Sequence, residues 1–166
     1  MATIRIPILG FTTRPDTSGD VFFEFNSIKG TNDFFKELVL VYNDTAAKDS
    51  IYGSFEVPQD YVGSAKFVVS WKTTATSGDV EWDMDYRSVA DGESLDQATA
   101  QESLNQNDTA GGSTDLKQTA LLTATEGNFA AADTVQFILS RDGTDAGDTI
   151  SAAVTVHGVY FEYADA

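Results

Sequence analysis

Cysteine is absent from this 166-residue chain, and histidine occurs once, at His157. The absence of cysteine excludes disulfides, thiolate zinc sites and thiol nucleophiles. One histidine also excludes any His/Cys metal cluster. His157 lies in the alternating run 154–163, where we expect it to pack or be solvated like its strand neighbours. The alternative is a lone general base.

Basic residues are scarce: there are 10 Lys and Arg against 26 Asp and Glu, which gives a net charge of −16. A protein that binds duplex nucleic acid gains affinity by neutralising phosphates with Lys and Arg. This chain would instead be repelled, so we predict no direct nucleic-acid binding. Solubility explains the charge most simply, and adaptation to salt or avoidance of a nearby nucleic acid are alternatives.

Long apolar runs are missing as well. No stretch approaches the roughly 18 consecutive apolar residues of a membrane helix, so we predict no membrane contact. Arg5 and Pro7 interrupt the apolar start of the chain, and we therefore expect no signal peptide and synthesis in a cytoplasm. The length suits a single hydrophobic core without disulfides or metals.

Hydrophobicity repeats with a period of two. Residues 79–89 alternate apolar and charged side chains, with Val80, Trp82, Met84 and Tyr86 on one phase. That period is typical of a half-buried strand in an antiparallel sheet. Further strands are predicted at residues 21–25, 37–42, 50–57, 65–72, 116–125, 134–141 and 153–163. About eight short strands with Gly- and Asp-rich turns predict an all-β sandwich or barrel.

Two regions stand outside this pattern. Residues 91–115 hold Leu95 and Leu104 as their large apolar residues, and we expect either a long loop or an exposed edge strand flanked by loops. In the first 30 residues, Ile4, Ile6 and Ile8 alternate. They form either an arm that binds a partner's sheet edge or an edge strand of their own domain, residues 31–166. Residues 31–36 could form a short helix.

Acidic residues supply the candidate metal ligands. Asp142, Asp145 and Asp148 lie in a Gly-rich turn and could hold a divalent cation such as calcium, which prefers several oxygen ligands from a flexible loop. The alternative is a turn without metal, because the spacing does not match an EF-hand. We predict no other cofactor. Loss of thermal stability on chelation would test the cation.

Two further sets of side chains are candidates for a catalytic or a sugar-binding site. Glu81, Asp83 and Asp85 project from one strand face about 7 Å apart, as a hydrolytic acid pair would, but a charged face usually faces solvent. Aromatic residues could form a sugar-stacking platform. These residues are Trp71, Trp82 and Tyr86. All three lie on the apolar phase of their strands, which favours packing in the core.

Several motifs between residues 50 and 163 together resemble a known family. They are Phe55-Glu-Val-Pro58-Gln-Asp-Tyr61, Val68-Val-Ser-Trp71-Lys, Thr76-Ser-Gly-Asp-Val-Glu-Trp82, Tyr86-Arg, Asp91-Gly-Glu-Ser-Leu95, Leu139-Ser-Arg141-Asp-Gly-Thr-Asp-Ala-Gly-Asp148-Thr and Phe161-Glu-Tyr163. The series resembles small jelly-roll structural proteins of tailed bacteriophages, including cyanophages. Some of these proteins are capsid cement or decoration proteins.

The resemblance implies an antiparallel jelly-roll sandwich of about eight strands that is not an enzyme. It also implies a homotrimer on the outer capsid surface of the virion, which binds the major capsid protein and stabilises the shell by avidity. The first 49 residues match less clearly and could hold the capsid contacts. The alternative function is a carbohydrate-binding or tail- or fibre-associated jelly-roll module, which would bind glycans.

Overall fold

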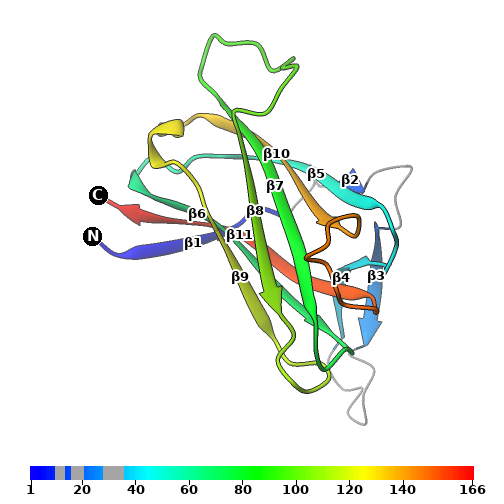
Figure 1. Ribbon diagram of the computed structural model, residues 1–166. Helices are drawn as coiled ribbons and strands as arrows, with labels where there is room; N and C mark the ends of the chain where they lie inside the picture. The colour runs from blue at the N-terminus through cyan, green and yellow to red at the C-terminus, as the bar shows by residue number, and fades with distance from the viewer. Residues whose placement is uncertain (10–13, 16–20, 28–35) are drawn as a thin grey trace.

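The computed structural model describes residues 1–9, 14–15, 21–27 and 36–166, and its regular structure is almost entirely β (Figure 1). In chain order the strands are β1 (Thr3–Pro7), β2 (Arg14–Pro15), β3 (Val21–Ser27), β4 (Lys36–Tyr42), β5 (Lys48–Glu56), β6 (Tyr61–Thr73), β7 (Asp79–Val89), β8 (Glu102–Thr109), β9 (Gln118–Thr123), β10 (Thr134–Asp142) and β11 (Val154–Asp165). A single 3-10 turn, η1 (Glu126–Asn128), is the helical element of these residues. None of their helices is long and apolar enough to cross a membrane.

Eight of the strands form a jelly roll. Sheet A contains the run β4-β11-β6-β9, and sheet B contains the run β5-β10-β7-β8. From β4 to β11 the chain crosses from one sheet to the other at every step except between β7 and β8, which pair with each other in sheet B. All strand pairs are antiparallel. The predicted antiparallel jelly-roll sandwich of about eight strands is confirmed.

The described parts of the first 30 residues lie in the two sheets. β1 pairs with β11 and β3 with β4 in sheet A, whereas β2 pairs with β5 in sheet B. Ile8 is buried in the core, and Ile4 and Ile6 are half-buried against it. The two ends of the chain therefore run side by side (Figure 1). The partner-binding role of these isoleucines stays a prediction.

The core between the sheets follows from the alternation along β7. Val80, Trp82, Met84 and Tyr86 are each at most 1% exposed. Full burial of an apolar side chain of this size contributes about 1.5–3 kcal/mol to stability. From the facing sheet, Trp71 meets Trp82 edge to face, with ring centroids 6.4 Å apart. The sequence pattern thus predicted both the strand and its inward phase correctly.

Residues 91–115 contain an edge strand flanked by loops, which was one of the two predicted alternatives. β8 occupies residues 102–109 and pairs with β7. The segment from 90 to 101 connects the two strands and extends beyond the end of the sandwich (Figure 1). The short helix predicted at residues 31–36 lies outside the described residues, except for Lys36, which begins β4.

Candidate functional site

A groove crosses three neighbouring strands on the outer face of sheet B. Two rows of outward-facing side chains from β5, β10 and β7 form its floor. They are Tyr52, Ile138 and Asp85 in one row, and Ser54, Gln136 and Arg87 in the next. Side chains alternate between the two faces of a strand, so these six lie opposite the residues that fill the core.

The segment between β7 and β8 forms a wall of the groove. Residues 95–100 line it, and the enclosed volume is 480 Å³. Arg87 Nη1 donates a hydrogen bond to the carbonyl oxygen of Thr99 at 3.3 Å, and the backbone N–H of Ser88 donates to Gln101 Oε1 at 3.0 Å. The wall is therefore tied to the floor along β7.

Gly53 shapes the floor from below. It lies on the inward phase of β5, opposite Phe137 of β10. A β-carbon at this position would lie 2.5 Å from Cζ of Phe137. Glycine thus lets the phenyl ring pack against β5 directly under the groove, which explains a glycine in the interior of a strand.

The groove combines exposed apolar surface with convergent polar groups. Tyr52 on the floor is 39% exposed and Leu95 on the wall is 56% exposed. Between them lie the half-buried side chains of Asp85, Arg87 and Gln136. A concave site of this composition offers an aromatic face for stacking and several donors and acceptors that can fix a ligand's orientation.

The same face becomes acidic towards the other end of β7. Lys48 Nζ forms an ion pair with Asp83 and lies 3.9 Å from Asp142. Glu81, next along the strand, is 3% exposed, and its Oε2 has no hydrogen-bond partner among the described residues. Burial, followed by the negative charges of nearby aspartates such as Asp145, raises the pKa of Glu81.

This arrangement corrects the expectation that Glu81, Asp83 and Asp85 share one solvated face. The segment after β10 folds over the sheet, where Asn107 Nδ2 donates to the carbonyl oxygen of Gly147 at 3.1 Å. Glu81 is covered as a result, whereas Asp85 lies in the groove. The two carboxylates therefore have different surroundings and do not flank a common opening.

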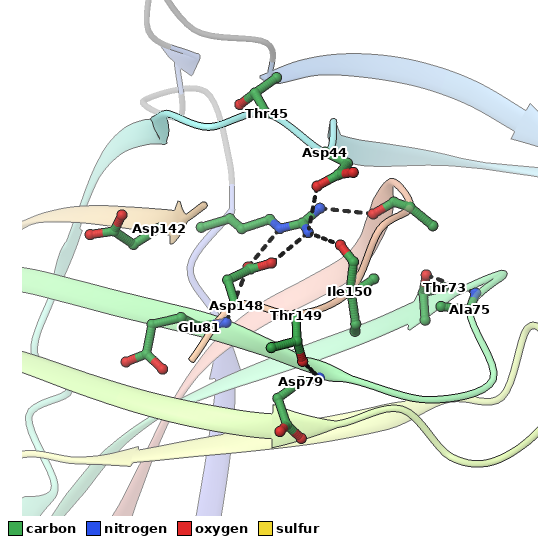
Figure 2. A network of polar contacts seen from close by, with 12 residues as sticks. Asp44, Thr45, Thr73, Ala75, Asp79, Glu81, Asp142, Asp148, Thr149 and Ile150 are labelled. Atoms are coloured by element: carbon green, nitrogen blue, oxygen red, sulfur yellow. Dashed lines mark hydrogen bonds and ion pairs between the residues drawn. The ribbon is translucent and has the colours of Figure 1, made fainter. Parts of the chain in front are cut away.

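Arg141 anchors that covering segment. Its side chain is 2% exposed, and its Nε and Nη2 donate to both carboxylate oxygens of Asp148, at 2.8 and 2.7 Å. Its remaining donors reach backbone carbonyl oxygens of Asn43, Ala152 and Ile150. Figure 2 shows Asp148, Ile150 and Asp44 around this guanidinium, while the Glu81 carboxylate points away from it.

The predicted cation ligands have different partners in this segment. Asp148 is taken up by the ion pair just described. Asp142 lies near Lys48, and Asp145 Oδ1 accepts a hydrogen bond from the backbone N–H of Gly147 at 2.7 Å. Across the described ranges, no group of three acidic or histidine side chains is arranged to hold a metal ion. A cation at these three aspartates stays a prediction.

The three aromatic residues considered from the sequence as a sugar-stacking platform lie in the core. Trp71, Trp82 and Tyr86 are each at most 1% exposed, as their strand phase predicted. In the groove on sheet B, the exposed aromatic ring is that of Tyr52, which the sequence reasoning missed. The sequence did contain a signal for this outward orientation, because Tyr52 lies between Ser50 and Ser54 on the polar phase of β5.

A second hollow of 540 Å³ lies along β11 on sheet A, where β4 and β1 leave a gap between their pairings with that strand. Its lining includes Phe23, Leu38, His157 and Tyr160. The lining is mostly apolar, so this hollow offers fewer groups to orient a polar ligand than the groove on sheet B.

Comparisons with known proteins bear on the fold. No protein-family model and no curated protein matches the chain. Three solved structures match with a TM-score of 0.50 over nearly the whole chain. The fold resembles that of carbohydrate-binding modules. The sequence identities of 9–14% show a shared fold and no more.

The first of these modules is the CBM22-1 xylan-binding domain of Xyn10C from Paenibacillus barcinonensis, at 9% identity over 93% of this chain and 87% of that one. A xylan-binding module, CBM15, is 14% identical over 99% and 97%. A family 11 module of the cellulase Lic26A-Cel5E from Clostridium thermocellum is 10% identical over 98% and 95%. These comparisons support the jelly-roll part of the predicted phage resemblance, but not the phage part.

Proposed function

We propose that this protein is a non-catalytic carbohydrate-binding module, which binds a glycan chain in the groove of sheet B. The observation that carries the proposal is the exposed ring of Tyr52 in a groove that also presents polar side chains from β7 and β10. The likeness of the fold to carbohydrate-binding modules supports it independently.

The chemistry of the groove suits a sugar. A pyranose ring presents a face of C–H groups, which are attracted to the electron-rich face of an aromatic ring such as Tyr52. Its hydroxyls both donate and accept hydrogen bonds, and Asp85, Gln136 and Arg87 supply acceptors and donors within two adjacent rows. For one stacked ring and a few hydrogen bonds we expect a Kd of roughly 1 μM to 1 mM, equivalent to a binding free energy of about −8 to −4 kcal/mol.

The capsid role predicted from the sequence stays a prediction. The comparisons support its jelly-roll fold and provide nothing for a virion setting, a homotrimer or the major capsid protein as partner. The alternative predicted alongside it, a carbohydrate-binding jelly-roll module, agrees better with the structural neighbours.

A glycan array with the purified chain tests the proposal. The array needs xylan, mixed-linked glucan and galactan oligosaccharides, together with acidic glycans. We expect saturable binding to at least one class, weakened at least tenfold by Tyr52→Ala. Tyr160→Ala is the matched control, because it removes a half-buried tyrosine from the other sheet. An array without hits, or equal loss in the two variants, would overturn the proposal.

A further inference from the structure

Arg87 lies in the groove without an anionic partner. The chain has 26 acidic residues, yet no described carboxylate lies within 4.0 Å of this guanidinium. Five other cations whose side chains the structure describes pair with acids. They are Arg5, Lys48, Lys66, Lys72 and Arg141. An unpaired, half-buried arginine in so acidic a protein is an exception that a ligand would explain.

The hydrogen bonding of Arg87 is also incomplete. A guanidinium carries five N–H donors in a planar fork and stays charged at every physiological pH. In the part of the chain that the structure describes, Arg87 donates to one acceptor, the carbonyl oxygen of Thr99, at 3.3 Å. Arg141 shows the contrast, because its donors reach both oxygens of Asp148 and three backbone carbonyls. Donors of Arg87 therefore remain for a ligand.

We infer that the groove recognises a glycan that carries a uronic acid, whose carboxylate pairs with Arg87 while a sugar ring stacks on Tyr52. This inference rests on the proposed function and names its substrate class. A carboxylate matches the arginine fork with two parallel hydrogen bonds, a geometry that a neutral hydroxyl cannot reproduce.

The spacing of the two residues sets where the acid lies on the ligand. Tyr52 and Arg87 are two strands and one row apart across the sheet. At ordinary strand spacings their α-carbons are about 12 Å apart. Both side chains are long, so the carboxylate belongs to the stacked sugar or to a near neighbour along the chain.

The surrounding charge limits how acidic the glycan can be. Asp85 lies on the groove floor and Asp96 on its wall, and the whole chain carries a net charge of −16. This field repels a densely charged polymer, such as a fully ionised polyuronate or a polysulfated chain. The expected ligand is a mainly neutral polysaccharide with isolated uronic acid units.

The test compares acidic glycans with neutral partners that differ in the carboxylate alone. An array carries glucuronoxylan, galacturonan and hyaluronan oligosaccharides, each beside its carboxyl-reduced form, and the best pair is then titrated calorimetrically at low salt. For a glycan with isolated uronic acid units, we expect the acidic form to bind at least tenfold more tightly than its carboxyl-reduced form. This preference should fall as the salt concentration rises. Arg87→Gln should abolish the preference, so that the acidic form and its carboxyl-reduced form bind this variant with equal affinity.

Lys117→Gln is the matched control, since it removes the same charge from an exposed position outside the groove. It should keep the preference, and Arg87→Lys should retain part of it. Equal binding of acidic and reduced forms, or a preference that survives in Arg87→Gln, would overturn the inference while the proposed function stands. Absence of binding to any glycan would overturn both.

Discussion

Arg141 and Asp148 form a bidentate ion pair in which each side chain is at most 3% exposed. Arg141 belongs to β10, and Asp148 to the segment that leaves this strand and folds over the acidic end of sheet B. The pair thus holds the segment between β10 and β11 in place. It also explains why an arginine occupies the inward phase of a strand whose other inward residues are Val135, Phe137 and Leu139.

Asp148→Asn should destabilise the fold by about 3–5 kcal/mol, because it removes the buried carboxylate partner of the Arg141 charge. The carboxylate that remains, Asp44, is half exposed and lies 3.5 Å from Nη2 of Arg141. Asp145→Asn is the control. Asp145 is exposed, and the amide oxygen of asparagine can still accept the hydrogen bond from Gly147. Urea unfolding of both variants measures the difference. Equal stabilities would show that the ion pair does not anchor this segment.

Chelation should leave the melting temperature unchanged. Both oxygens of Asp148 accept hydrogen bonds from Arg141, so the three aspartates of the turn are not free to share a cation. Differential scanning fluorimetry with EDTA and then with excess calcium checks this. A melting temperature that falls with EDTA and recovers with calcium would instead support the cation predicted from the sequence.

Glu81→Gln should stabilise the protein at neutral pH. The folded chain holds the Glu81 proton to a higher pH than the unfolded chain, because burial and the neighbouring aspartates raise its pKa. Stability therefore falls as pH rises from the ordinary glutamate pKa through the raised one. The variant escapes this loss. At pH 7 its Tm should rise by about 2–4 °C, the shift that 1 kcal/mol produces in a domain of this size.

Glu162→Gln is the control with the opposite sign. Burial of Glu162 opposes ionisation, but its bonds to Arg5 and Lys66 prevail and lower its pKa. The stability from this carboxylate is present above the ordinary glutamate pKa and is lost as pH falls through the lowered one. Melting curves from pH 3 to 7 should show Glu162→Gln less stable than wild type at pH 7. Shifts of equal sign in both variants would contradict these assignments.

Leu95→Ala should weaken glycan binding several-fold without altering stability. Leu95 is 56% exposed on the wall of the groove, so its truncation removes contact area for a ligand and little from the core. Leu121→Ala removes a similarly exposed leucine from β9 of sheet A and should not affect binding. Titration of both variants with the best-binding oligosaccharide compares them, and equal affinities would exclude the wall from the site.

The fold could be predicted from the sequence because strand alternation is a local signal. The pattern at residues 79–89 indicated a strand and its inward face, and β7 has those bounds and that phase. Burial of Glu81 could not be predicted in this way. It depends on a segment more than 60 residues later that folds back over the sheet.

The groove could not be predicted from the pattern of any single strand. Its floor combines Tyr52, Gln136 and Arg87, which become neighbours only through the order and register of β5, β10 and β7. The pairings of these two floor rows join residues 49–86 positions apart, from Gln136 with Arg87 to Ile138 with Tyr52. Hydrophobic alternation sets the phase of each strand but not its register against a distant partner. The charged face of residues 79–89, on which Arg87 also lies, was therefore expected to face solvent.

An NMR titration tests the central claim most directly. Uniformly ¹⁵N-labelled chain is titrated with the tightest-binding oligosaccharide from the array, and backbone amide shifts are mapped onto the two sheets. We predict saturable shifts at Gly53, Ser54, Arg87, Thr99 and Gln136, and none around Tyr160 on sheet A. Shifts centred on sheet A, or no shifts with any glycan, would contradict a carbohydrate site in the groove of sheet B.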